Sequence, residues 1–368
     1  MQESNRYRKI FLPYLFLLVG GVAAAQVPQA ATLRILTYNV YEGTDFAPLR
    51  ALLLEPPDQQ LAGFPAAVGA SLQQVIESDP VARAAAIADQ IMRTHPDVVV
   101  LQEANSWQIT LPSGGPFMFD FTTTLMAELA TRGLKYSVAA SADGFVLGSD
   151  ATDPADYLPA VTTDHNVVLI SNGLHPGEIA VSNVQSTNFP DSLTLFLPIP
   201  GGPPAGVPVT RDWISMDVAF RGYAFTLIGT HLEAFYPPAT VGQAQFLVSS
   251  VGTSGPMVLA GDFNANASDA SDPTYGAYYL ITQAGFTDAW DALHPGGNPP
   301  GYTCCQLTEV GANLTNFKSL FNQRIDHVFV RNLEFVSAQV IGREQSAKTP
   351  DGLWPSDHGG LLVEIALK

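Results

Sequence analysis

The chain has 368 residues, of which 46% are hydrophobic and 14% charged, so it is long and apolar enough for one large α/β domain with a sizeable core. Its 34 Asp and Glu residues against 17 Lys and Arg give a formal net charge of −17. This charge opposes long-range attraction to a nucleic-acid backbone or an anionic membrane, and it argues against a protein that binds either one through a broad basic surface.

The first 25 residues have the pattern of a signal peptide. Basic residues at positions 6–9 precede an apolar stretch at 10–22, and three alanines at 23–25 offer a cleavage site. An uncleaved membrane anchor is the alternative, but 13 apolar residues fall short of the roughly 20 that span a bilayer. We expect cleavage near Ala25 and a secreted or periplasmic product, residues 26–368, with 14 Lys and Arg, 33 Asp and Glu and a net charge of −19.

Strand-like and helix-like segments alternate along the rest of the chain, which predicts an α/β fold. The first strand is predicted at 33–40, followed by a Pro-, Gly- and Gln-rich insertion at 43–78 with a short helix at best. Asp79 and Pro80 then begin a helix that ends at His95. The later elements are a buried strand at 97–101, a helix at 118–131, strands at 166–171, 213–220 and 224–229, a helix at 239–251, and strands at 257–260, 325–330 and 361–366.

A second insertion, residues 189–208, is apolar and rich in proline, with almost no charge. We expect a loop packed over the fold, and a surface that contacts lipid or a partner remains the alternative. No internal repeat and no clear linker divide the chain, so residues 26–368 are predicted to form a single domain.

Cys304 and Cys305 are the only cysteines, and they are adjacent. They cannot close a long loop, and they are too few for a zinc site. We expect a structural role, either as a vicinal disulfide in an oxidising compartment or as two small buried thiols.

Polar residues follow several of the predicted strands at the point where each strand ends. In layered α/β folds, the loops beyond strand ends are where functional sites form. Any one such residue is more often a helix cap or a turn former, but the joint pattern predicts one shared site. The residues are Asn39, Glu103, His231, Asp262 with Asn264, Asp326 with His327, and Asp357 with His358.

These residue types fit the hydrolysis of a phosphoester. The reaction needs neutralised charge on the phosphoryl oxygens, a positioned water and help for the leaving group. A hard divalent cation takes oxygen ligands from one or two carboxylates and an amide. A further carboxylate accepts the proton of the water, and imidazoles hold the phosphate or stabilise the transition state.

Six segments, in order, resemble the endonuclease/exonuclease/phosphatase superfamily, the group with the deoxyribonuclease I-like fold. They are LTYNV, VVLQE, IGTHLEA, VLAGDFNA, RIDHVFV and SDHGGLLVEI, and the resemblance covers about residues 32–368. It implies a four-layer αββα sandwich, with two mixed β-sheets packed face to face and helices outside. The relatives include apurinic endonucleases, neutral sphingomyelinases and inositol-polyphosphate phosphatases.

The resemblance also implies a metal site. Glu103 would be the main ligand of Mg²⁺, or of Mn²⁺ in its place, with Asn39 in the same shell and Asp357 close to the metal. Whether one metal or two act is left open.

The catalytic roles are carried over in the same way. Asp262 would be the base or water-orienting carboxylate, and Asn264 would position the water or the phosphate. His231 would hydrogen-bond the scissile phosphate. Asp326 would orient His358, whose imidazole would stabilise the transition state or assist the leaving group.

Four further residues lie near these motifs. Asn166 is a candidate substrate contact because relatives carry a polar residue there. Arg324 and Arg211 are candidate phosphate contacts, with a structural role as the alternative. His327 directly follows Asp326 on a predicted strand and should therefore face away from the site.

The substrate stays open between several classes. A phosphodiesterase or endonuclease-type enzyme is the leading interpretation, although the chain has few cations for a nucleic-acid groove. A sphingomyelinase-like phospholipid phosphodiesterase fits the apolar insertion, but no aromatic hairpin is evident in the sequence. A non-catalytic binding protein on the same fold is the third alternative. We expect a monomer without a transmembrane segment.

Overall fold

The computed structural model of the chain describes residues 31–111, 115–148, 159–190, 192–199, 202–252, 254–306 and 314–367. The predicted signal peptide at 1–25 lies outside these residues. None of the helices in the described ranges combines the length and the apolar character that a membrane span needs.

The larger of two sheets has eight strands in the order β15-β16-β1-β2-β6-β3-β4, with β5 also paired to β6. β1 runs parallel to β2, whereas β16 and β6 are antiparallel to their neighbours. The strands are β1 (Ala31–Asn39), β2 (Val98–Gln102), β3 (Ser106–Thr110), β4 (Pro116–Asp120), β5 (Tyr136–Leu147), β6 (Ala160–Ser171), β15 (Glu334–Ile341) and β16 (Gly360–Leu367).

The second sheet has six strands in the order β13-β14-β12-β11-β10-β7, and a separate hairpin pairs β8 with β9. β11 and β12 are parallel, and their other partners are antiparallel. The strands are β7 (Ile179–Asn188), β8 (Leu193–Leu197), β9 (Ala205–Val209), β10 (Asp212–Phe220), β11 (Tyr223–His231), β12 (Met257–Asp262), β13 (Thr287–Asp288) and β14 (Asp326–Arg331).

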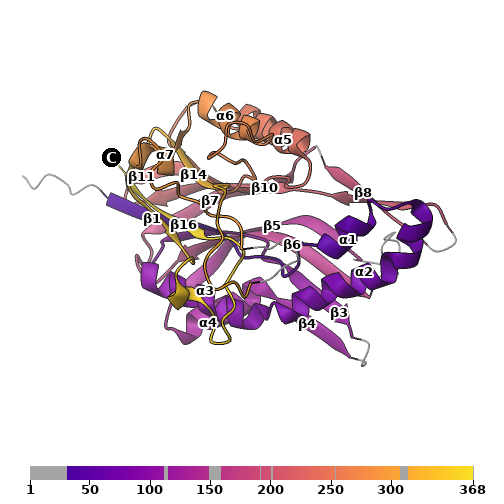
Figure 1. Ribbon diagram of the computed structural model, residues 1–368. Coiled ribbons are helices and arrows are strands. Elements are labelled where there is room, and N and C mark those ends of the chain that lie inside the picture. The colour runs from indigo at the N-terminus through magenta and orange to yellow at the C-terminus, as the bar shows by residue number, and fades with distance from the viewer. Residues whose placement is uncertain are drawn as a thin grey trace, which may run out of the picture. The chain divides into compact units, whose positions relative to one another are not determined.

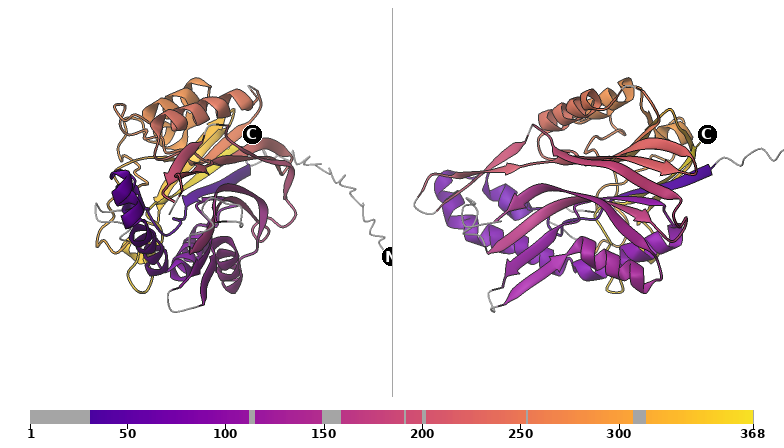
Figure 2. Two further views of the ribbon diagram at one scale, coloured as in Figure 1. Left: turned by 90° about the vertical axis from the view of Figure 1, so that its right-hand side faces the viewer. Right: turned by 180° about the vertical axis from the view of Figure 1, so that it is seen from behind.

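The two sheets pack face to face because apolar residues alternate along their strands. Ile35 and Val100 of the larger sheet belong to one buried cluster with Leu227, Val258 and Val328 of the smaller sheet. The intervening residues of the same strands point to the outer faces and pack against helices. This gives the four layers that the resemblance implies, and Figures 1 and 2 show helices outside both sheets.

The helices divide between the two outer faces (Figure 1). α3 (Pro80–Thr94) and α4 (Phe121–Thr131) cover the larger sheet through Ile87 and Leu125. α5 (Pro237–Ser250) and α6 (Tyr275–Gln283) cover the smaller sheet through Leu247 and Ile281. The remaining helices are α1 (Ala47–Leu52), α2 (Pro57–Glu77), α7 (Ala289–Leu293) and the 3₁₀ turn η1 (Gln345–Ala347).

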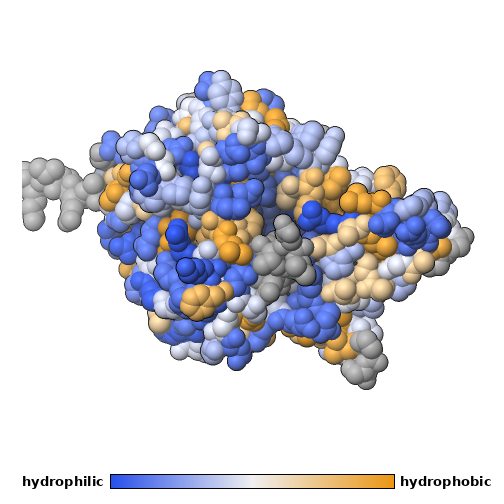
Figure 3. All heavy atoms as spheres, in the orientation of Figure 1, coloured by the Kyte–Doolittle hydropathy of each residue, from blue (hydrophilic) through white to orange (hydrophobic). Residues whose placement is uncertain are grey.

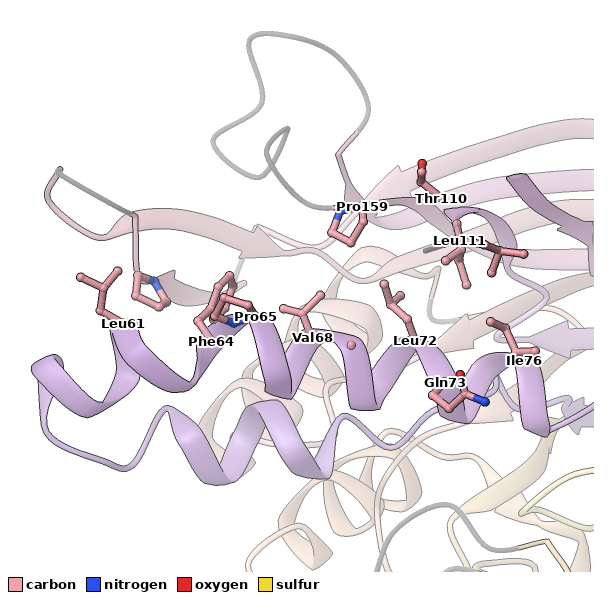
Figure 4. A pocket seen from close by; sticks show the side chains of 13 residues that line it. Leu61, Phe64, Pro65, Val68, Leu72, Gln73, Ile76, Thr110, Leu111 and Pro159 are labelled. Atoms are coloured by element: carbon pink, nitrogen blue, oxygen red, sulfur yellow. The ribbon is translucent and has the colours of Figure 1, made fainter. Parts of the chain in front are cut away.

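The insertion at 43–78 differs from the sequence prediction, because α2 is a helix of 21 residues. Phe64, Val68 and Leu72 keep a helical spacing and pack against Trp107 of β3. The internal Pro65 and the nearby glycines hid this periodicity in the sequence. The same face of α2 borders an apolar cavity of about 530 Å³ toward the end of β3 and Pro159, and its lining side chains are drawn in Figure 4.

The insertion at 189–208 also differs from the predicted loop, since it contains the antiparallel β8–β9 hairpin. Leu195 and Val207 form a directly opposed pair within it. The helix predicted at 118–131 begins only at Phe121, because residues 116–120 pair with β3 as β4. Asp120 caps that helix by accepting a hydrogen bond from the Thr123 N–H.

Gly229 of β11 lies where the two sheets approach each other closely. A Cβ atom at this position would be 2.8 Å from Cγ1 of Val100 in the opposite sheet. Real contacts between carbon atoms are longer, so only glycine fits without a shift of one strand.

We predict that Gly229→Ala lowers the free energy of unfolding by about 1–3 kcal/mol, because it overpacks the interface between the sheets. Urea denaturation of the two proteins measures the difference. Gly252→Ala is the matched control, since no atom lies within 4 Å of its Cβ position, and its stability should be unchanged or slightly higher. Equal stabilities of Gly229→Ala and the control would contradict the predicted close approach.

Candidate active site

Polar residues from both sheets meet at the ends of their central strands. In the larger sheet Asn39 is opposite Gln102, so Asn39 and the following Glu103 leave their strands side by side. In the smaller sheet Asp262 lies between His231 and Asp326 in register. The parallel pairs of the two sheets therefore bring the LTYNV, VVLQE and GDFN motifs to one place.

Asn39 links the two sheets at this place. Its Nδ2 donates to Glu103 Oε1 at 2.9 Å and to Asp262 Oδ2 at 3.0 Å, while its Oδ1 accepts from the Tyr41 N–H at 3.0 Å. The backbone donor fixes the orientation of the amide, because a backbone N–H has no acceptor role. Asn39 thus directs its NH₂ group at the carboxylates, and in this arrangement it positions Glu103 and Asp262.

Two of the site residues adopt left-handed backbone conformations that are uncommon without glycine. Glu103 has φ 55° and Asn264 has φ 46°. Surrounding hydrogen bonds hold both: Glu103 Oε2 accepts from the Glu42 N–H, and Asn264 Nδ2 donates to the Leu232 carbonyl. Such outliers cluster at functional sites, where the neighbouring structure fixes them.

Asp262 is the central carboxylate. Its Oδ2 lies 3.6 Å from His231 Nε2 and 3.8 Å from His358 Nε2, and its Oδ1 accepts from the Asn264 N–H at 2.9 Å. Burial and the neighbouring Asp326 raise the pKa of Asp262 to about 7. A carboxylate with a pKa near neutrality is suited to accept a proton from water.

The preceding Gly261 lets this strand end approach its neighbour. A Cβ atom there would lie 2.0 Å from the Thr230 carbonyl oxygen, so no other residue fits without displacing the backbone beside His231. The glycine of the GDFN motif is therefore explained by packing.

His231 is held as a neutral donor. The Arg211 guanidinium, which can only donate, lies with Nη1 3.2 Å from His231 Nδ1. The proton of the neutral ring is therefore on Nε2, the nitrogen that faces Asp262. Burial and the Arg211 charge hold the pKa of His231 well below 6.5.

His358 has the opposite electrostatic setting. Its Nδ1 donates to Asp326 Oδ2 at 2.9 Å, and its Nε2 lies 4.0 Å from Asp357 Oδ1. Although burial opposes the charge, the carboxylates of Asp326 and Asp357 raise the pKa of His358 well above 6.5. The two imidazoles that face Asp262 thus differ in charge.

The pocket around these residues is strongly acidic, which fits a divalent cation. Burial and the charge of Glu103 raise the pKa of Glu42 well above 4.5. Burial raises the pKa of Asp357 to about 7 despite the nearby His358, and Glu103 adds to the rise. Buried oxygen donors with this excess of negative charge form the ligand set that a hard cation prefers.

Two groups of described residues place possible ligand atoms within 4.8 Å of one another: Asp262, Asp326 and His358, and Cys304, Cys305 and His358. The second group is not a thiolate site, because Cys304 and Cys305 are joined in a disulfide. Both cysteines line the pocket, and the Cys304 backbone bridges to Gln323 and His358.

Several candidate residues lie outside this pocket. Asn166 is buried and donates to Asp212 Oδ1 at 2.9 Å. Arg324 is held by Asp288 and Asp291, each at 2.6 Å, and does not line the cavity. His327 faces away from the site, as its place in the strand predicts, and contacts Asp288 Oδ2 at 2.8 Å.

Three acidic residues in or beside the pocket were not singled out in the sequence, and of these Glu42 lines it. Glu42 follows the LTYNV motif and receives the amide hydrogen bond of Asn105. Asp164 and Glu233 flank Arg211 at 3.4 Å and 3.5 Å. Proximity to a motif was the only sequence signal for Glu42, and Asp164 had none, because its contact with Arg211 joins residues far apart in the sequence.

Arg83 of α3 is fully buried beneath the site and was also missed. Its guanidinium donates to the carbonyls of Ser78, Val40, Tyr41 and Pro355 at 2.7–3.2 Å. Val40 and Tyr41 follow β1, Pro355 precedes His358, and Ser78 lies at the C-terminal end of α2. Burial lowers the pKa of Arg83 to about 10, which leaves it charged at neutral pH.

The model of the Endonuclease/Exonuclease/phosphatase family matches residues 36–358, so the chain belongs to this family. Members of the family are metal-dependent phosphoester hydrolases, and the chain is accordingly an enzyme of this class. A comparison with curated proteins finds no match.

Solved structures share the fold at low sequence identity. A family protein from Bacteroides thetaiotaomicron has a TM-score of 0.52 and 16% identity, over 92% of this chain and 96% of that one. A family protein from Leptotrichia buccalis has a TM-score of 0.52 and 15% identity, over 91% and 100%. Humanized TDP2 of D. rerio has a TM-score of 0.50 and 16% identity, over 91% and 98%.

We predict that Arg83→Met lowers the free energy of unfolding by at least about 3 kcal/mol, because several buried carbonyls lose their donor at once. Thermal and urea denaturation measure the loss. Arg93→Met, at the exposed end of the same helix, is the control and should change stability by less than about 0.5 kcal/mol. A stable Arg83→Met protein would show that water satisfies these carbonyls.

Proposed function

We propose that the chain is an exported, Mg²⁺-dependent phosphodiesterase in which Mn²⁺ can replace Mg²⁺. The observation that carries this proposal is the position of Asp262 between two imidazole nitrogens, at 3.6 Å and 3.8 Å. A water or phosphoryl oxygen beside Asp262 would contact a proton acceptor and two nitrogen donors together.

Each side chain then has a defined task. Asp262 accepts the proton of the attacking water, and Asn264, with its backbone fixed by Asp262, helps to position that water. Neutral His231 donates its Nε2–H to a phosphoryl oxygen. Charged His358, oriented by Asp326, stabilises the negative charge that develops as the leaving group departs.

A divalent metal ion bound here would supply positive charge to neutralise the phosphoryl oxygens and would make water more acidic. Glu103 and Asp357 are the carboxylates that we assign to hold it, with Asn39 orienting Glu103. The raised pKa values of the neighbouring acids support this assignment, since a cation relieves their mutual repulsion.

The substrate is a phosphodiester, and a large nucleic-acid groove is not favoured. Besides the two histidines, the basic residues among the described ones that line the pocket are Arg50 and Arg211, and Arg211 is engaged by Asp164 and Glu233. Few cations are thus free to contact a long polyanion. Asn166 and Arg324, the other substrate candidates, are engaged with carboxylates elsewhere, so we assign them positioning rather than contact roles.

A phospholipid phosphodiesterase is the second candidate, and the β8–β9 hairpin favours it. Phe196 is 61% exposed on this hairpin. Leu195 and Val207 of the hairpin line a cavity that is also bordered by Glu103 and Arg211 of the active-site pocket. An exposed aromatic residue on a short hairpin is suited to contact a lipid surface. Parallel assays on DNA, RNA and sphingomyelin vesicles separate the two candidates.

Purified residues 26–368 should hydrolyse bis(p-nitrophenyl) phosphate with Mg²⁺ or Mn²⁺ and lose this activity in EDTA. Asp262→Ala and His358→Ala should each lower kcat/KM at least about 10³-fold, because each removes a group that acts in the transition state. Release of p-nitrophenolate measures the rates, and circular dichroism checks the fold.

Asp58→Ala is the matched control, because Asp58 lies exposed in the first turn of α2 and should leave the rate unchanged. A folded Asp262→Ala protein that keeps most of its activity would rule out the assigned base. No turnover with either metal would count against the phosphodiesterase itself.

Export is tested separately. The full chain, expressed in a bacterium with a secretory pathway, should appear outside the cytoplasm with Gln26 as its first residue, because residues 10–22 are too short to anchor it. Mass spectrometry of the purified protein gives the N-terminus. Recovery of the intact chain in the membrane fraction would favour the anchor.

A further inference from the structure

A second cavity adjoins the catalytic pocket. It has a volume of about 140 Å³, and five residues line both cavities: Glu42, Arg50, Glu103, Arg211 and Phe235. The charged side chains lie along this shared border. A ligand with its charged end in the catalytic pocket would therefore extend directly into the second cavity.

Apart from the carboxylate of Asp164, the rest of the second cavity is lined by apolar side chains from three sides. α1 and the residues beside it contribute Phe46, Leu49 and Leu53, and β5 contributes Phe145 and Leu147. Leu49 and Leu53 are spaced by one helical turn, which directs both toward the same side.

The β8–β9 hairpin forms the third side. Leu193 is opposite Val209 and Leu195 is opposite Val207, so both pairs project from one face of the hairpin, and all four line the cavity. Leu193, Leu195 and Val207 come from the insertion at 189–208, and Val209 follows it directly. Figure 3 shows hydrophobic residues gathered on this side of the molecule, in the region of α1, α2 and β8.

Arg50 and Phe235 mark the opening between the two cavities. The Arg50 guanidinium lies 4.6 Å from the centre of the Phe235 ring, and Phe235 is 49% exposed. A cation stacked on an aromatic ring offers one side to a phosphate oxygen and leaves the ring edge for a hydrocarbon group.

We propose that this cavity binds a compact apolar substituent of the substrate, of about the size of a benzene ring, while the attached phosphate occupies the catalytic pocket. A dry cavity of similar volume lined by leucine and phenylalanine takes a benzene-sized molecule. The inference rests on the proposed function, and it narrows the substrate to phosphoesters that carry an aryl or short alkyl group.

The test measures binding without turnover. Phenylphosphonate and methylphosphonate share a charged head group and differ in the apolar group, and each is titrated into the Mg²⁺-supplemented protein by calorimetry. We expect phenylphosphonate to bind at least about tenfold more tightly than methylphosphonate. A single methylene group that fits an apolar pocket already changes selectivity about tenfold or more.

Two variants fill the cavity from two of its three walls. Leu195→Trp on β8 and Leu49→Trp on α1 should each reduce the difference in affinity between phenylphosphonate and methylphosphonate to about twofold or less. Leu61→Trp is the control, because Leu61 lines the separate cavity along α2 in Figure 4, and the preference should persist.

Equal affinities in the unsubstituted protein, or a preference that survives in both cavity variants, would overturn the inference. Loss of the preference in Leu61→Trp alone would also overturn it and would place the apolar group along α2. Failure of the phosphodiesterase proposal is recognised independently, by absent hydrolysis of bis(p-nitrophenyl) phosphate in the same buffer.

Discussion

The buried guanidinium of Arg83 is the contact on which the geometry of the active site depends. It reaches from α3 through the outer layer and donates to carbonyls on both sides of the site, at Val40 and Tyr41 after β1 and at Pro355 before His358. A lysine could not replace it, because one ammonium group cannot reach acceptors spread around a plane. The same hydrogen bonds thereby connect α3, the end of β1 and the segment that carries the His358 imidazole.

The charge of Arg83 matters as well as its hydrogen bonds. Its neighbours include Asp357 and Glu103, and it has no carboxylate hydrogen-bond partner of its own among the residues described. Arg83 therefore places a fixed positive charge close to the acidic residues of the pocket. This charge reduces the repulsion among the buried carboxylates without occupying any of their oxygen atoms, which remain free to bind a cation.

Sequence was sufficient for the parts of the fold whose physical signal is local. The strands that end in Asn39 and Asp262 are apolar runs with a polar end, and α3 has a capping aspartate and a proline at its start. The four-layer sandwich was implied by the family resemblance that the six ordered motifs carry. The same motifs identified the residues that surround Asp262.

Two kinds of feature could not be predicted in this way: contacts between residues far apart in the sequence, and elements whose periodicity is hidden by proline, glycine or a uniformly apolar composition. The proline and glycines of α2 hid its apolar face, and the β8–β9 hairpin consists of alternating pairs within a segment that reads as uniformly apolar. The roles of Arg83 and Asp164 depend on contacts made between distant segments. Arg324 is the reverse case, because a basic residue beside a motif turned out to be held by Asp288 and Asp291.

The two imidazoles on either side of Asp262 differ in charge, so the electrostatic environment of the pocket is asymmetric. His231 presents a neutral N–H, and His358 presents a charged one. The two non-bridging oxygens of a bound phosphodiester would therefore meet different donors, and the site treats them as inequivalent. A protein built in this way would distinguish the two diastereomers of a phosphorothioate, because sulfur is a weaker hydrogen-bond acceptor than oxygen and would face a different donor in each diastereomer.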